Sequence, residues 1–75
     1  MLEPETMTTF QKVLWGLKIL DGYLSRENPG EIACEHDEIM VGGVHVNVLG
    51  GDDRAMLEAM GWRWSREFEA WKRSV

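Results

Sequence analysis

The apolar positions in the first third of the chain recur at helical spacing. Thr8 is followed three residues later by Gln11, which is the spacing of a capping box at the start of a helix. Apolar residues then follow at steps of three and four along one face: Phe10, Val13, Leu14, Leu17, Leu20 and Leu24. The pattern predicts a helix over about 8–24 that buries this face. Pro29 and Gly30 end it, because proline lacks an amide and glycine admits positive φ.

A second apolar row runs along the same predicted helix. Trp15, Ile19 and Tyr23 follow one another at four-residue steps, so the apolar arc is wider than contact with one sheet requires. Either the helix is buried on two sides, or one row is exposed; an exposed row of Trp15, Ile19 and Tyr23 would serve self-association.

The middle of the chain changes to a period of two, which is typical of strands. Apolar and β-branched residues alternate over 32–35, 39–41 and 44–48, and these segments are expected to form an antiparallel hairpin or meander. Gly42-Gly43 is a plausible two-residue hairpin turn, because primed turns need positive φ. His36-Asp37 is a second possible turn.

A short second helix is predicted to follow. It begins at Asp52 or Asp53, whose carboxylates suit an N-cap and the positive end of the helix dipole. Gly61 supplies its C-terminal stop. Its inward residues are expected to be apolar: Met56, Leu57 and Met60.

Three of the four tryptophans fall in the last fourteen residues, and the fourth is Trp15. Trp62 and Trp64 alternate as a strand would, whereas Trp64, Phe68 and Trp71 with Val75 also fit one helical face. Propensity slightly favours the helix. Each buried aromatic ring removes about 150–250 Å² from water, so these rings form either the core or an aromatic contact surface. One of Trp62 and Trp64 is expected to be in the core.

Charge is unevenly distributed in this chain of net charge −5. No Lys or Arg occurs from Glu27 to Asp53. Acids in this stretch are candidate protein-binding residues: Glu35, Asp37, Glu38, Asp52 and Asp53. They form either a solvated surface that keeps the protein soluble or a surface that docks on a basic groove of a nucleic-acid-binding protein. The acidic balance argues against direct binding of nucleic acid.

Candidate chemistry is sparse. Atoms that can bind zinc occur at Cys34, His36 and His45, but the spacing of these residues is not that of the paired ligands of a structural zinc site. We therefore expect a buried cysteine and two surface histidines. No metal, cofactor or catalytic constellation is predicted, and the protein is not expected to be an enzyme. The single cysteine is typical of a protein in a reducing compartment, and no recognisable leader is seen, so we expect a cytoplasmic location. No apolar stretch reaches the length of about 20 residues that spans a bilayer, so we expect no membrane contact.

A resemblance covers residues 33–75. It rests on Glu35-His36-Asp37-Glu38-Ile39, on the acid-started segment 52–62, and on Trp64, Glu67 and Trp71. This pattern resembles short uncharacterised phage and prophage proteins with a Gly-Trp-x-Trp…Trp C-terminal tail. The resemblance implies that the tail is a hairpin with its turn over 65–69.

The expected fold class is therefore α+β. The middle strands and the C-terminal hairpin form a small antiparallel sheet, packed against the long N-terminal helix and the short second helix. The chain is a single domain, 1–75, with residues 1–7 as a flexible N-terminus.

The expected function is that of a small acidic phage-type protein that binds a host or phage protein without enzymatic activity. Inhibition of a defence nuclease, as in anti-CRISPR proteins, is one concrete form. The alternatives are a structural protein that self-associates, as a homodimer, and a nucleic-acid-binding module that uses the Trp and Arg side chains of the tail.

Overall fold

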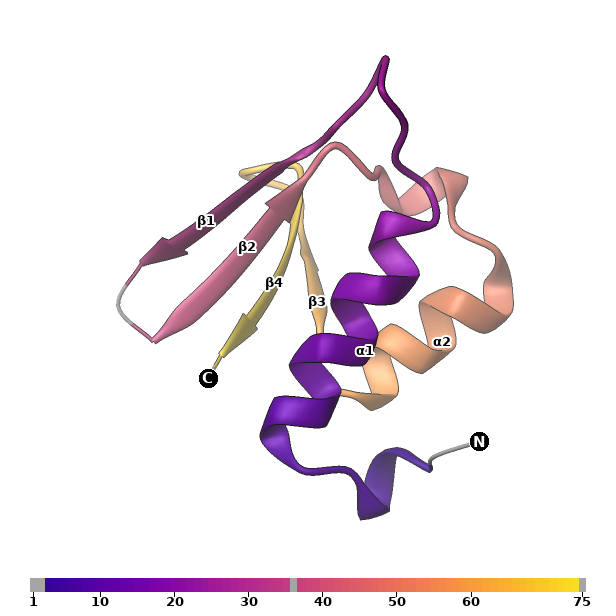
Figure 1. The fold of residues 1–75 in the computed structure, drawn as a ribbon, viewed down its shortest axis with the longest axis vertical. Coiled ribbons are helices and arrows are strands. Elements are labelled where there is room, and N and C mark those ends of the chain that lie inside the picture. The colour runs from indigo at the N-terminus through magenta and orange to yellow at the C-terminus, as the bar shows by residue number, and fades with distance from the viewer. Residues whose placement is uncertain (1–2, 36, 75) are drawn as a thin grey trace.

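The protein has an α+β fold, seen in a computed structural model that describes residues 3–35 and 37–74 (Figure 1). Two α-helices and four strands make up most of the described chain, with one short 3-10 helix before them and a second between the second strand and the second α-helix. In chain order they are η1 (Pro4–Thr6), α1 (Thr9–Asp21), β1 (Glu31–Glu35), β2 (Glu38–Gly42), η2 (Val46–Val48), α2 (Gly51–Ala59), β3 (Arg63–Ser65) and β4 (Ala70–Ser74). The predicted fold class is confirmed.

The start of α1 is confirmed and its end is earlier than predicted. Thr8 Oγ1 accepts a hydrogen bond of 3.1 Å from the amide of Gln11, and the Gln11 side chain accepts one of 2.9 Å from the amide of Thr8. The helix ends at Asp21, because the amides of Tyr23 and Leu24 bond to carbonyls three residues back instead of four.

All four strands pair antiparallel in the order β1-β2-β4-β3. Glu35 lies opposite Glu38, so β1 and β2 are joined at the second possible turn, of which His36 lies outside the described residues. The predicted turn at Gly42-Gly43 is wrong. β2 has β1 on one side and β4 on the other, so neither of its edges is left for a strand that folds back from Gly43.

The segment 44–48 is therefore not a strand. Val44 enters the core, and Val46–Val48 forms η2, with the amide of Asn47 donating to Nδ1 of His45 at 3.1 Å. Gly43 makes the change of direction possible, because its φ is 103° and a Cβ there would lie 2.7 Å from Cα of Gly30.

The second helix is present, but its predicted N-cap is wrong. α2 begins at Gly51 after Gly50, without a side-chain cap, and Asp52 and Asp53 occupy its first turn. Both carboxylates still lie at the positive end of the helix dipole. Leu57 and Met60 are buried as expected.

The C-terminal hairpin is confirmed. β3 and β4 pair with Trp64 opposite Trp71, and the chain turns between Ser65 and Ala70. The helical alternative is wrong, since Phe68 is exposed whereas Trp71 is buried. Val75, which was grouped with that face, lies outside the described residues.

The two helices cover one face of the sheet (Figure 1), and the indole of Trp62 joins them to the tail. Trp62 and Trp71 are each 1% exposed, so Trp62 is the member of the Trp62 and Trp64 pair that lies in the core. Trp62 Nε1 donates to the carbonyl of Lys12 at 3.1 Å. Its ring lies directly on Gly16, where any Cβ would overlap it.

The N-terminal segment makes one contact with the core. Residues 4–6 form η1, and Met7 is 6% exposed and belongs to the core. Met1 and Leu2 lie outside the described residues.

Candidate functional site

The five candidate acids do not form one surface. Glu35 and Asp37 are exposed beside the β1–β2 turn, at the left edge of Figure 1, and Glu38 begins β2. Asp52 and Asp53 lie at the start of α2, at the right edge of the same view. The hairpin formed by β1 and β2 therefore carries one acidic group, and α2 carries another.

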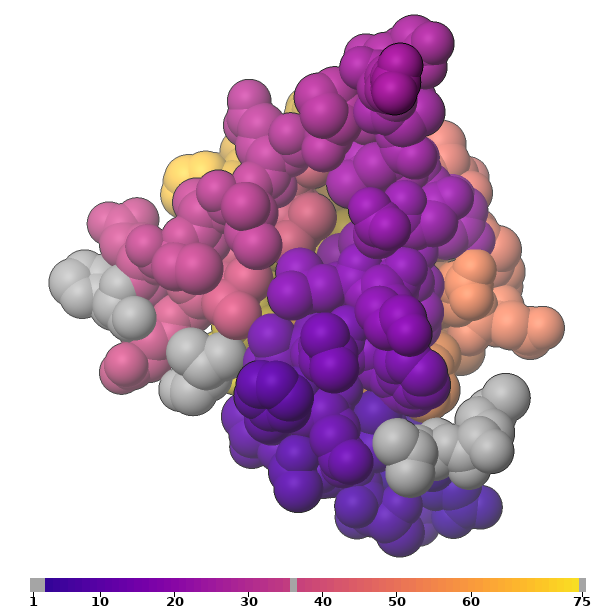
Figure 2. Space-filling view, in the orientation of Figure 1, coloured from indigo at the N-terminus to yellow at the C-terminus, as the bar shows by residue number. Residues whose placement is uncertain are grey.

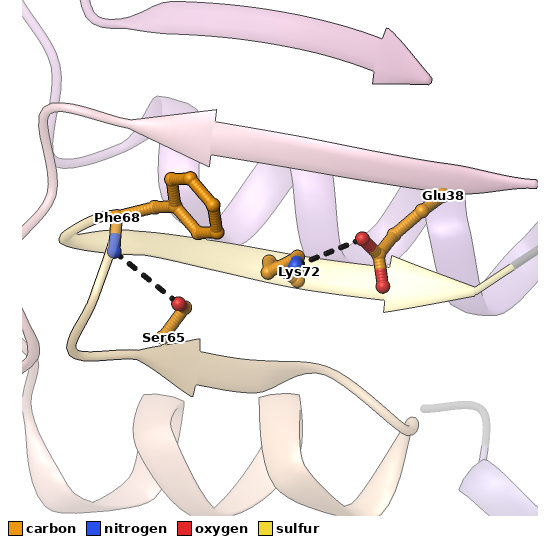
Figure 3. Close-up of polar contacts among 4 residues, drawn as sticks. All are labelled: Glu38, Ser65, Phe68 and Lys72. Atoms are coloured by element: carbon orange, nitrogen blue, oxygen red, sulfur yellow. Dashed lines mark hydrogen bonds and ion pairs between the residues drawn. The ribbon is translucent and has the colours of Figure 1, made fainter. Parts of the chain in front are cut away.

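Glu38 is engaged within the sheet. Its Oε1 pairs with Nζ of Lys72 at 2.9 Å, and that ammonium also lies 5.0 Å from the ring centroid of Phe68 (Figure 3). The hairpin turn before β4 is held by a 3.4 Å hydrogen bond from the amide of Phe68 to Ser65 Oγ. Lys72 thus neutralises Glu38, whereas neither Glu35 nor Asp37 pairs with a cation within the described residues.

Asp53 is also engaged. The hydroxyl of Tyr23 donates a short hydrogen bond to Asp53 Oδ2, and it accepts one of 3.0 Å from the amide of Gly50. The bond to Asp53 raises the pKa of Tyr23 above its usual value of about 10, because the carboxylate favours the protonated phenol. Asp53 therefore links the end of α1 to the start of α2 and is not a free docking carboxylate.

The second apolar row of α1 is half-buried. Trp15, Ile19 and Tyr23 pack against the core, and a groove between α1 and α2 is lined by Trp15, Ile19 and Met56. Nζ of Lys18 lies 4.7 Å from the centre of the Trp15 ring. This row is thus partly covered by the core and by α2, so it is not the exposed row of the helix.

The exposed apolar side chains of α1 belong instead to the row that was predicted to be buried. Phe10 is 74% exposed and Leu14 47% exposed, and on β1 Ile32 is 63% exposed. Phe10, Leu14 and Leu17 share one helix face by their spacing. For Phe10 and Leu14 the prediction of burial is wrong, whereas Leu20 of the same row is buried.

An apolar groove lies between α1 and the β1–β2 hairpin. Leu17 and Leu24 line it from the helical side, and Ile32 and Val41 line it from the strands. Figure 2 shows this face, with the hollow between the magenta strands and the purple helix. Lys18 and Asp21 lie at its border.

β1 is exposed along all five residues. Because side chains alternate along a strand, Ile32 and Cys34 share the face of the groove, and Glu31, Ala33 and Glu35 share the outer face. Cys34 is expected to be buried, but it is exposed, because no strand of the described residues pairs with this edge of the sheet. Alternation alone could not have revealed this, because it does not say which strand is the outermost.

The remaining candidate chemistry is not supported by the geometry. Within residues 3–35 and 37–74, no three side chains of His, Cys, Asp or Glu gather to hold a metal ion. His45 is exposed and packs edge-on against Trp64 at 5.0 Å between ring centroids. His36 lies outside the described residues.

The tryptophans of the tail are mostly withdrawn from solvent. Trp62 and Trp71 are buried, and Trp64 is half-buried with its ring edge-on to Trp71 at 5.8 Å. Exposed cations flank them at Arg63 and Arg66. Since base stacking needs accessible aromatic faces, the buried rings of Trp62 and Trp71 are not available for it.

Comparison of the chain with protein-family models, with curated proteins and with solved structures finds no match. Among the helices of the described residues, none is long and apolar enough to cross a bilayer. The features that bear on function are therefore the exposed strand β1, the charge of its hairpin and the groove beside it.

Proposed function

We propose that this protein acts by non-enzymatic binding to another protein, and that the acidic β1–β2 hairpin is the docking surface. One observation carries the proposal: β1 is exposed along its whole length, bears Glu31 and Glu35, and leads directly to Asp37. A strand that is exposed to this extent contributes little to the core. A binding role accounts for its length and charge.

The electrostatics favour a basic partner. No Lys or Arg occurs between Glu27 and Asp53, and Lys72 of the sheet is already paired with Glu38. Among the described residues, Glu31, Glu35 and Asp37 form no ion pair, so the hairpin presents negative charge. Such a surface speeds encounter with a positively charged partner and repels nucleic acid.

The concrete form that we propose is a phage-type protein that occupies a host protein, such as a defence nuclease. The resemblance of the tail to short phage and prophage proteins supports the origin. The charge supports the target, because a nuclease binds phosphates through a groove rich in Lys and Arg. An acidic hairpin competes with nucleic acid for such a groove.

A capture experiment tests this proposal. The purified protein is immobilised, exposed to bacterial lysate and compared with the triple variant Glu31→Gln, Glu35→Gln and Asp37→Asn. Glu38 is left unchanged because it pairs with Lys72. A matched control removes the same charge elsewhere on the surface, by Glu3→Gln, Glu5→Gln and Glu67→Gln.

The hairpin variant is expected to lose its captured protein, and the control variant to retain it. Capture by the parent should weaken as salt rises, since the Debye length falls from about 10 Å at 0.1 M to about 3 Å at 1 M. Equal capture by all three proteins would refute the role of the hairpin.

A further inference from the structure

We infer that the outer edge of β1 accepts an extended segment of the partner as a fifth strand, and that this segment alternates Lys or Arg with apolar residues. The inference rests on the proposed protein-binding function and specifies how the partner is recognised. Within the described residues no strand pairs with this edge. The edge of a sheet offers alternate N–H and C=O groups, which bind a further strand through backbone hydrogen bonds.

β1 is a better acceptor than the opposite edge of the sheet. β3 has three residues, contains Arg63, and lies beside His45, whose ring packs on Trp64. Short length, basic charge and covering segments are the features that block strand addition. β1 has five residues in continuous register with β2, without proline, Lys or Arg.

The side chains of β1 specify an alternating partner. An added strand places its residues about 4.5–5.5 Å from those directly opposite on the same face. On the outer face these neighbours are Glu31 and Glu35, which attract Lys or Arg. On the other face the neighbour is Ile32, which borders the groove, so apolar residues fit there.

The groove supplies apolar surface that an added strand would cover. Ile32 is 63% exposed, and Leu17 and Leu24 face it across the groove. Leu14 continues the helix face of Leu17 and is 47% exposed. Apolar side chains of the added strand would lie between β1 and α1, and their burial would add to the backbone hydrogen bonds.

A second copy of the chain is a poorer occupant than a basic segment. Antiparallel pairing of two β1 strands about Ala33 would place Glu31 of each copy opposite Glu35 of the other. Like charges directly opposite one another destabilise a strand pair, whereas opposite charges stabilise it. The two glutamates therefore disfavour self-association at this edge and leave it open to a basic strand.

Two short synthetic peptides test the inference, each about seven residues long so as to span the five of β1. One alternates lysine with valine, and the other alternates glutamate with valine. Binding to the full chain is followed by the NMR shifts and hydrogen exchange of the β1 amides. The parent protein should prefer the lysine peptide by about tenfold, and Glu31→Lys with Glu35→Lys should reverse this preference.

Two controls separate strand addition from nonspecific attraction. A lysine peptide with alternate backbone amides methylated keeps its charge but cannot form the edge hydrogen bonds, and it should bind at least about tenfold more weakly. The charge reversals Glu3→Lys and Glu67→Lys, at exposed positions outside the β1–β2 hairpin, should leave the preference for the lysine peptide unchanged.

Equal binding of the methylated and unmethylated peptides would overturn strand addition. Slow hydrogen exchange of the β1 amides in a dimer without peptide would also overturn the inference, because a second copy of the chain would then occupy the edge. If the peptides fail but lysate capture still depends on the hairpin acids, the proposed function stands and only the mode of recognition is refuted.

Discussion

Gly16→Ala is the substitution for which the packing and the intrinsic helix propensity predict opposite signs. The ring of Trp62 lies against the bare backbone of α1 at this position. A Cβ on Gly16 would be 2.0 Å from Nε1, 2.3 Å from Cε2 and 2.8 Å from Cζ2 of that ring. All three distances are far below a van der Waals contact, so the indole must move.

The magnitude follows from what the displaced ring would lose. Alanine in place of glycine inside a helix stabilises it by about 0.5–1 kcal/mol. Against this, overpacking costs about 1–3 kcal/mol, and loss of the hydrogen bond from Trp62 Nε1 to the Lys12 carbonyl costs about 1 kcal/mol. The net expectation is a destabilisation of about 1–3 kcal/mol, and more if the ring leaves the core.

Urea or thermal unfolding, followed by circular dichroism, measures this change. For a chain of 75 residues the loss corresponds to a melting temperature lower by at least about 4–8 °C. Gly51→Ala is the matched control. It lies at the start of α2 with no atom within 4 Å of the new Cβ, so its stability should stay the same or rise slightly.

A double variant tests whether the clash is the cause. Once Trp62→Ala has removed the ring, Gly16→Ala has room and should no longer destabilise, so the double variant should be at least as stable as Trp62→Ala alone. If Gly16→Ala by itself is as stable as the parent, the indole does not lie on Gly16 as described, and the reasoning fails.

Three further predictions concern the aromatic residues. In urea unfolding, Trp62→Phe should destabilise the protein by about 1–3 kcal/mol more than Trp71→Phe does. The reason is that Trp62 Nε1 has a hydrogen-bond acceptor, whereas Trp71 Nε1 is buried without one in the described residues. Equal losses of stability would contradict this. Trp62→Ala should lower the free energy of unfolding by about 3–5 kcal/mol, and Trp64→Ala should lower it less. Similar melting curves for the two variants would argue against Trp62 as the main core ring. Tyr23 is the single tyrosine, so tyrosinate absorbance should show its pKa above about 10, and Asp53→Asn should lower it. Because the folded state holds the Tyr23 proton more tightly than the unfolded state, the Tyr23–Asp53 bond stabilises the fold below about pH 10, and this stabilisation is lost as the pH rises through the folded-state pKa. An unchanged midpoint of the tyrosinate titration in Asp53→Asn would refute the link.

Features set by neighbouring residues could be predicted from the sequence. The start of α1 depends on Thr8 and Gln11, which are three residues apart and exchange hydrogen bonds. The end of α2 at Ala59 is also set locally, because Gly61 follows it with a φ of 90°. The tail hairpin was implied by the resemblance, although propensity alone slightly favoured a helix. There, pairing of Trp64 with Trp71 and burial of apolar surface outweigh local preference.

Features that depend on distant pairing could not be predicted. The segment 44–48 alternates as a strand does, and its valines fit a sheet as well as they fit the observed turn. This segment is excluded from the sheet because β4, which lies some 30 residues after β2 in the chain, pairs along β2. No pattern within 44–48 contains that information, since it depends on competition between two segments for one strand edge.

The same competition creates the candidate site. β2 pairs with β4 on one side and β1 on the other, which leaves β1 as an outer strand with its second edge unpaired in the described chain. A partner strand that carries apolar residues on one face and cations on the other would meet Ile32 beside the groove on one face and Glu31 and Glu35 on the outer face.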